Sequence, residues 1–297
     1  WFFGPGFEDT DPIVAVSNSY GWSADYEDGY DWHGQYIVQL QRYYAPYLQF
    51  FFSTGNGAPG YATTAPPSPM LGIAVGASTE YGSTGWDTIT DTDQIMYNDI
   101  AAFSNSGPGA RGGAGVDVVA GGAYAAGAEE LNYYTASMFG TLDGDSSWAS
   151  WGGTSRSAPT AMGVYALLVD AYYDANGAYP TNDVGKALLM STATDVNHDV
   201  FKQGAGSVNA DTGTMVASGE YGIYMDGDSA TWEPGDFRND EPKADAPGFA
   251  HLMYPGDTDD KEFTLVNDSP YDIVVDVTDG YLSRIGEELI SFDVTPA

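Results

Sequence analysis

Residues 151–159 read WGGTSRSAP, and this stretch decides the fold. Two glycines precede Thr154 and Ser155, and glycine lets the backbone turn closely. The apolar run AMGVYALLV follows at once and predicts a helix that begins at this turn. A helix N-terminus favours developing negative charge, so Ser155 stands where a nucleophile would be well served. A serine that only caps the helix is the simpler interpretation, although Thr154 or Ser157 could cap it equally well.

The composition limits the classes of function. The chain has 297 residues, 43% of them apolar, which is ample for a large core. Its 42 acidic and 9 basic residues give a net charge of −33, which argues against nucleic acid or an anionic membrane as a partner. No apolar run approaches the roughly 20 residues of a membrane span.

The charge also bears on where the protein works. A large acidic excess suits a saline exterior, where salt screens self-repulsion, and a merely acidic secreted protein is the alternative interpretation. The absence of cysteine says little about the compartment, because a chain of this size does not need disulfides. The glycosylation sequon at 267–269 fits an exterior setting. We therefore expect an extracellular or cell-surface protein.

Four short apolar runs predict strands, and a helical pattern lies between the first two. The runs occupy 12–20, 48–53, 70–77 and 115–122, and the helix occupies 35–44. Strand, helix and strand at this spacing indicate a parallel α/β sheet with flanking helices. In such a sheet, ligands bind beyond the carboxyl ends of the strands, where the polar turns SNSYG and STGNG both fall.

Two longer helices are predicted around and after the opening stretch. The first covers 155–172 and tolerates proline at 159 in its first turn, and the second runs from about 182 to 193 with Thr181 as its N-cap. Residues 203–213 are interpreted as a turn that closes this domain. The apolar face of the first helix is expected to contain Ala158, Met162, Tyr165, Ala166 and Val169.

The pattern changes near residue 218, where helical periodicity ends. Alternating runs at 261–267 and 271–277 predict antiparallel strands between Gly, Asp and Pro turns. We therefore divide the chain into an α/β domain at 1–217 and an antiparallel, β-sandwich-like module at 218–297. The module ends in what resembles a strand rather than a tail, so we expect it to be incomplete.

Five segments resemble, in order, the motifs of the subtilisin-like serine proteases (subtilases). They are VAVSNSYG, STGNGAPG, GIAVGAS, AFSNSGP with VDVVAGG, and GGTSRSAP, so the resemblance covers roughly 12–213. It implies a subtilisin-like sheet, formed in part, and peptide-bond hydrolysis through an acyl-enzyme on Ser155. Two positions depart from the family pattern: Arg156 follows the serine, and Gly121 replaces a proline. The substrate specificity of the family is therefore not carried over to this chain.

The resemblance also assigns roles around Ser155. Asn56 matches the asparagine whose side-chain amide holds the oxyanion, although an Asn-Gly turn is the simpler interpretation. Ser19, Tyr20 and Gly21, with Thr54 and Gly55, match segments that bind substrate as an added strand. An ordinary exit from a strand explains the first three equally well. Protein or peptide substrates are the expected partners.

The histidine and aspartate of the family's triad have no counterpart among these motifs. In the family both lie upstream of the SNSYG-like segment, and here His33, His198 and His251 lie outside any matching motif. We expect an upstream segment or chain, the N-terminal part of the same protease, to supply both residues. The alternative is a catalytically inactive subtilase-fold protein with a structural or cell-surface role.

The chemistry needs no cofactor, but acidic turns suggest Ca²⁺ as a structural ion. The candidate ligands are Asp226, Asp228, Asp257 and Asp259, because calcium prefers several oxygen ligands on a turn-rich backbone. None of them falls in a recognised calcium loop, and in so acidic a chain a solvated surface is the alternative interpretation.

Overall fold

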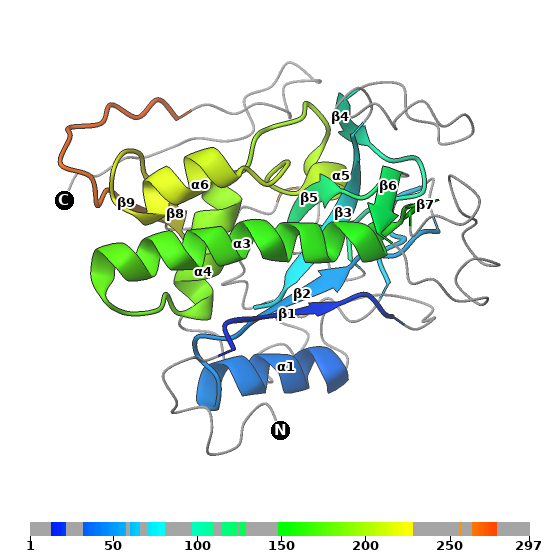
Figure 1. Cartoon of the computed structure of the whole chain (residues 1–297), viewed down its shortest axis with the longest axis horizontal. Coiled ribbons are helices and arrows are strands. Elements are labelled where there is room, and N and C mark those ends of the chain that lie inside the picture. The colour runs from blue at the N-terminus through cyan, green and yellow to red at the C-terminus, as the bar shows by residue number, and fades with distance from the viewer. Residues whose placement is uncertain are drawn as a thin grey trace.

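The chain is described by a computed structural model, which defines residues 13–21, 32–57, 60–65, 71–80, 97–109, 114–123, 125–128, 148–227, 256 and 263–277. The main sheet consists of β1 (Ala15–Asn18), β2 (Gln49–Ser53), β3 (Ile73–Glu80), β4 (Tyr97–Ile100) and β5 (Val118–Gly121). The helices are α1 (Trp32–Tyr43), α3 (Thr154–Asn176), α4 (Asn182–Ser191), α5 (Val200–Gln203) and α6 (Ala210–Ala217). The predicted α/β architecture is confirmed (Figure 1).

The central strands are parallel, as the sequence predicts. β1 pairs with β2, β2 with β3, and β3 with β5, all in parallel, while β4 pairs antiparallel with the end of β3. In the register of the first pair, Asn18 lies opposite Phe52, so both strands end at the same edge of the sheet. The loops that follow β1 and β2 therefore emerge side by side.

Helices cover the two faces of this sheet. Phe51 of β2 is fully buried in the larger core, which α3 closes with Ala158, Tyr165 and Leu168. Phe50 and Phe52 point to the other face, where they pack in a second cluster with Leu40 of α1. Figure 1 accordingly shows α3 and α1 on opposite sides of the strands. This alternation explains why the run at 48–53 is apolar at every central position.

Helix boundaries differ from the predictions in instructive ways. The predicted N-cap of α4 is confirmed, because the Thr181 hydroxyl accepts a hydrogen bond from Val184 N. The predicted turn at 203–213 is wrong in its second half, which forms α6. Gly213 suggested a turn, but this glycine lets α6 approach Leu168 of α3 so closely that a Cβ at 213 would collide with the Leu168 side chain. In α3 itself, Ala166 is predicted to lie on the apolar face but is exposed. Leu168, which is not in that prediction, is buried in the core instead.

Beyond α6 the described residues form a small antiparallel pair, β8 (Tyr224–Asp226) and β9 (Thr264–Val266). The strand predicted at 271–277 is wrong: these residues are not in a strand, and the Val274 side chain is 91% exposed. Alternation alone could not reveal that six of these seven residues are exposed. α6 ends at Ala217, yet Tyr224 belongs to the larger core. The division at 217/218 therefore stays a prediction.

A second antiparallel pair, β6 (Ala125–Ala128) and β7 (Trp148–Trp151), leads directly into α3. Among the described helices, none is both long and apolar enough to cross a membrane.

Candidate active site

The candidate site lies where the loops after β1 and β2 meet the N-terminus of α3. Ser19 is the first residue after β1, Asn56 follows β2 by three residues, and Ser155 is the second residue of α3. Because parallel neighbouring strands end together, the first two loops share one edge of the sheet. Hydrogen bonds from both loops reach α3, so three segments far apart in sequence converge here.

Asn56 is fixed by Thr154, the residue before Ser155. The Asn56 side-chain oxygen accepts hydrogen bonds from Thr154 N and from Thr154 Oγ1, each at 2.8 Å. A backbone N–H can only donate, so this contact identifies which amide atom faces α3. The Asn56 NH₂ group is therefore not used by Thr154; it lies on an exposed residue, beside Gly153, and is available as a donor.

Asn105 supports the Asn56 loop from the other side. Its side chain donates to Thr54 O at 3.0 Å and accepts from Gly57 N at 2.6 Å, while its backbone N donates to Gly55 O at 3.0 Å. Gly55 has φ = +101°, and a Cβ there would collide with the Asn105 amide. The AFSNSGP motif signals this residue in the sequence, but its role appears only when residues 48 positions apart meet.

Ser155 is half-buried at the start of α3. The N–H groups of a first helical turn have no intrahelical acceptor, so the Ser155 N–H is one of the donors that a helix leaves open. Its carbonyl oxygen accepts a hydrogen bond from Ser19 Oγ at 2.8 Å. Its neighbour Arg156 donates from Nη1 to Ala123 O at 2.7 Å, which ties the guanidinium to the chain beyond β5.

The predicted substrate residues lie around this point. Ser19, Tyr20 and Gly21 are exposed, and the Tyr20 ring stands edge-on to Phe52 at 6.5 Å between centroids. Thr54 is buried, 1% exposed, and Gly55 is half-buried. Thr54 thus belongs to the support of the loop, whereas the open surface is formed by the segment after β1 and by Asn56.

No histidine of the described residues hydrogen-bonds to Ser155. His33 lies on α1, the helix that covers the opposite face of the sheet from α3. His198 Nε2 lies 2.6 Å from Asp99 Oδ1 of β4. His251 lies outside the described residues.

The calcium candidates lie mostly beyond what the structure describes. Asp226 is the last residue of β8, and Asp228, Asp257 and Asp259 fall outside the described residues. Within the described ranges, no group of three or more His, Asp or Glu side chains is arranged to hold a metal ion. The calcium assignment stays a prediction.

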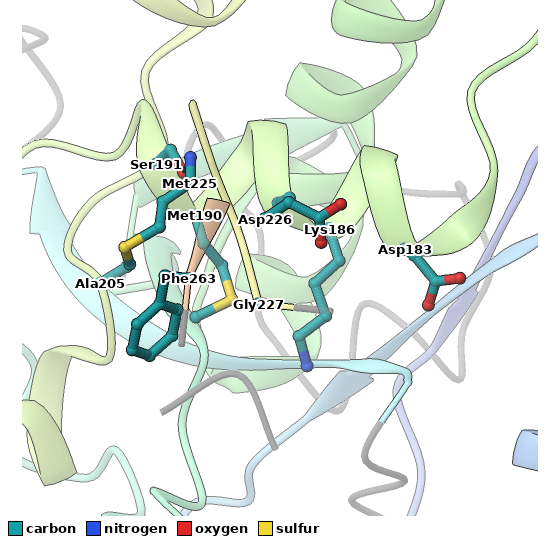
Figure 2. Close-up of a pocket in the computed structure, with 10 residues that line it drawn as sticks. Asp183, Lys186, Met190, Ser191, Ala205, Met225, Asp226, Gly227 and Phe263 are labelled. Atoms are coloured by element: carbon teal, nitrogen blue, oxygen red, sulfur yellow. Dashed lines mark hydrogen bonds between the residues drawn. The ribbon is translucent and has the colours of Figure 1, made fainter. Parts of the chain in front are cut away.

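A cavity of about 160 Å³ lies between α4 and β8; Asp226 lines it, and none of the residues predicted around Ser155 does. Figure 2 shows Met190, Met225 and Phe263 gathered on one side of it. Lys186 Nζ, also in its lining, is 2.9 Å from Asp117 and 2.7 Å from Gly72 O. A second charged residue of the lining, Asp183, is 2.8 Å from Arg42, so the side chains of Lys186 and Asp183 hold the fold together. The third charged residue of the lining is Asp226 of β8.

Comparison with known proteins identifies the family. The model of the subtilase family of serine peptidases matches residues 10–206, and the chain belongs to this family. A search of curated protein sequences returned no match.

Several solved structures resemble the chain. The Prenylagaramide maturation protease PagA is 21% identical with a TM-score of 0.48, over 70% of this chain and 63% of that one. The Patellamide maturation protease PatA is 19% identical with a TM-score of 0.48, over 69% and 63%. A lanthipeptide protease is 16% identical with a TM-score of 0.47, over 70% and 62%. The chain thus spans less than two thirds of the length of these structures.

Proposed function

We propose that this chain carries the nucleophile and the oxyanion donor of a secreted subtilisin-like serine endopeptidase. The single observation that carries the proposal is the double hydrogen bond from Thr154 to the Asn56 oxygen, beside Ser155. It leaves the Asn56 NH₂ free to donate at the position where an acyl-transfer reaction develops negative charge. A donor held in place beforehand stabilises the transition state more than the ground state.

The reaction follows from this arrangement. A histidine takes the proton of Ser155 Oγ as that oxygen attacks the carbonyl carbon of a peptide bond. The Asn56 NH₂ and the Ser155 N–H donate to the resulting oxyanion, and the amine leaves with the proton from the histidine. Water then hydrolyses the acyl-enzyme on Ser155. The aspartate and histidine are supplied by an upstream segment, the N-terminal part of the same protease.

The exposed segment after β1 and the acidic charge indicate the substrate and the location of the protein. Protein or peptide substrates pair with the exposed segment Ser19, Tyr20 and Gly21 as an added strand. No cofactor takes part in the chemistry, and Ca²⁺ has only a structural role, through the acidic turns around Asp226. The net charge of −33 supports a location outside the cell, either in the extracellular space or on the cell surface.

The test is covalent labelling of the natural protein by a fluorophosphonate probe, followed by identification of the labelled peptide. We expect the label on Ser155, and we expect Ser155→Ala to lose both labelling and peptide hydrolysis. Ser157→Ala is the matched control, because Ser157 lies in the same helical turn but is fully buried; it should label normally. Labelling of Ser155→Ala as strong as that of the wild type contradicts the assignment.

The mass of the active particle tests the second half of the proposal. Intact-mass measurement of labelled material should reveal polypeptide beyond these 297 residues. An active particle that contains only this polypeptide would overturn the supply of aspartate and histidine from elsewhere. A full-length protein that folds, contains the upstream part and still fails to label favours the inactive structural alternative.

A further inference from the structure

Pro159 removes a hydrogen bond from the backbone of Ser155. In an α-helix the N–H of each residue donates to the carbonyl four residues earlier, so residue 159 would serve Ser155 O. Proline has no N–H, and its ring also crowds that carbonyl. Pro159 nevertheless lies inside α3, five residues after its first residue. The carbonyl of the proposed nucleophile therefore loses its regular helical partner.

Ser19 donates to this same carbonyl. Ser19 Oγ lies 2.8 Å from Ser155 O, an ordinary distance for a hydroxyl donor, across 136 positions of sequence. The hydroxyl takes the place of the N–H that Pro159 lacks. A helix carbonyl without its own N–H partner is the acceptor that a neighbouring side chain can use without competing with the helix.

The donor stands on a fixed part of the molecule. Ser19 directly follows β1, which is paired in register with β2 and covered by α3. The preceding residue, Asn18, is buried and its side chain donates to Phe51 O at 3.2 Å. The backbone at Ser19 is thus held by the sheet, and its hydroxyl transfers that position to α3.

Together these contacts fix Ser155 from two directions. On its N-terminal side, Thr154 is hydrogen-bonded to Asn56, and on its carbonyl side Ser155 is hydrogen-bonded to Ser19. Nucleophilic attack depends on such placement, since a displacement of 1 Å can cost about a hundredfold in rate. We propose that Ser19 is a positioning residue for Ser155 and that its side chain does not bind substrate. This inference rests on the proposed function of Ser155.

The hydroxyl group and the backbone of Ser19 have different roles. Its hydroxyl hydrogen is committed to Ser155 O, whereas its backbone, with that of Tyr20 and Gly21, lies on an exposed segment that a peptide can pair with. Loss of the hydroxyl should therefore slow the chemical step and leave substrate affinity unchanged. A hydroxyl that bound substrate would have the opposite signature, because its loss would raise KM.

The kinetic test compares Ser19→Ala with Ser19→Thr in the natural protein. We expect the loss of one hydrogen bond to displace Ser155 by less than the ~1 Å that costs about a hundredfold in rate, so kcat and the fluorophosphonate labelling rate should fall about tenfold in Ser19→Ala, with KM unchanged. Ser19→Thr keeps the hydroxyl and should recover most of both rates. Unchanged kcat, an increase confined to KM, or equal loss in both variants would overturn the positioning role.

A second measurement reports on the hydrogen bond without any catalysis. Serine labelled with ¹³C at its carbonyl and arginine labelled with ¹⁵N give a signal only for Ser–Arg pairs, and the sequence has two, at 155–156 and 283–284. The Ser155→Ala variant identifies the first signal by its disappearance. We expect the Ser155 carbonyl resonance to move upfield in Ser19→Ala and to return in Ser19→Thr.

The two measurements distinguish the ways in which the inference can fail. An unmoved carbonyl resonance in Ser19→Ala refutes the hydrogen bond, whatever the kinetics show. A shifted resonance in a natural protein that never labels refutes the proposed function and with it the positioning role, while the contact itself stands. A shifted resonance with unchanged labelling leaves the proposed function intact and refutes only the role assigned to Ser19.

Discussion

Two glycines ten residues apart should respond to the same substitution with opposite signs. Gly153 precedes α3 with φ = 136° and ψ = 162°, a backbone region that is accessible essentially only to glycine. Its N–H donates to Gly122 O at 2.7 Å and its carbonyl accepts from Arg156 N at 2.9 Å, so this conformation is held on both sides. Gly163 lies inside α3, and a Cβ there would meet nothing within 4 Å.

These backbone conformations determine how much each substitution should change the free energy of unfolding. Gly153→Ala forces a side chain into the glycine-only region, at a cost of about 1–3 kcal/mol in the free energy of unfolding. The new Cβ would also lie 3.2 Å from the Asn56 amide nitrogen, which has to yield. Gly163→Ala relieves the entropic cost of glycine in a helix and should stabilise the protein by about 0.5–1 kcal/mol.

Urea denaturation at fixed ionic strength measures both changes against the wild type. The midpoint should fall for Gly153→Ala and rise for Gly163→Ala, with unchanged denaturant slopes. The Gly153 variant should also label more slowly with fluorophosphonate, because Asn56 is displaced. A Gly153→Ala protein as stable as the wild type would refute the conformation assigned to the turn before α3, and a destabilised Gly163→Ala protein would refute the open environment of Gly163.

Three further outcomes are expected from buried polar groups. Lys186→Met should lower the free energy of unfolding by about 3 kcal/mol, since it leaves the Asp117 carboxylate without its partner at 2.9 Å; urea denaturation that shows no loss contradicts this. Tyr165→Phe should raise stability by about 1 kcal/mol in the same assay, because the buried Tyr165 hydroxyl has no hydrogen-bond partner among the described residues; a loss of stability would reveal a partner. Burial, followed by the charge of Asp268, raises the pKa of Tyr224 to about 12 from 10.0 in the unfolded chain. The unfolded chain therefore ionises first, so stability should fall from pH 10 to 12, and this fall should be smaller in Tyr224→Phe.

The sequence predicted the layers of the fold well, because each layer has a local signature. The run at 48–53 is apolar at its three central positions and forms a strand covered on both faces, and Thr181 caps α4 as its position suggested. Local signatures failed where the same residue type is compatible with two different structures. Gly213 indicates a turn in isolation, yet it forms a close contact with Leu168 between two helices.

The candidate site could be predicted only in part, for a related reason. Ser155 and Asn56 are named by motifs, and the structure brings the residue before Ser155 into contact with Asn56. The supports of these two residues depend on long-range hydrogen bonds that have no local pattern, namely those of Asn105 to the Asn56 loop and of Ser19 to Ser155 O. No histidine motif accompanies Ser155, because in the family that motif lies upstream of the SNSYG-like segment, and the described histidines His33 and His198 lie on α1 and beside Asp99.

The hydrogen bond between Ser19 and Ser155 also bears on how the chain folds. It joins residues 136 positions apart, and the Asn56–Thr154 contacts span 98. Contacts between residues so far apart in sequence form late, after the chain between them has closed into a loop. A growing chain has no arranged nucleophile until α3 has been synthesised and docked. The fold thereby delays the appearance of a reactive serine until the domain around it has formed.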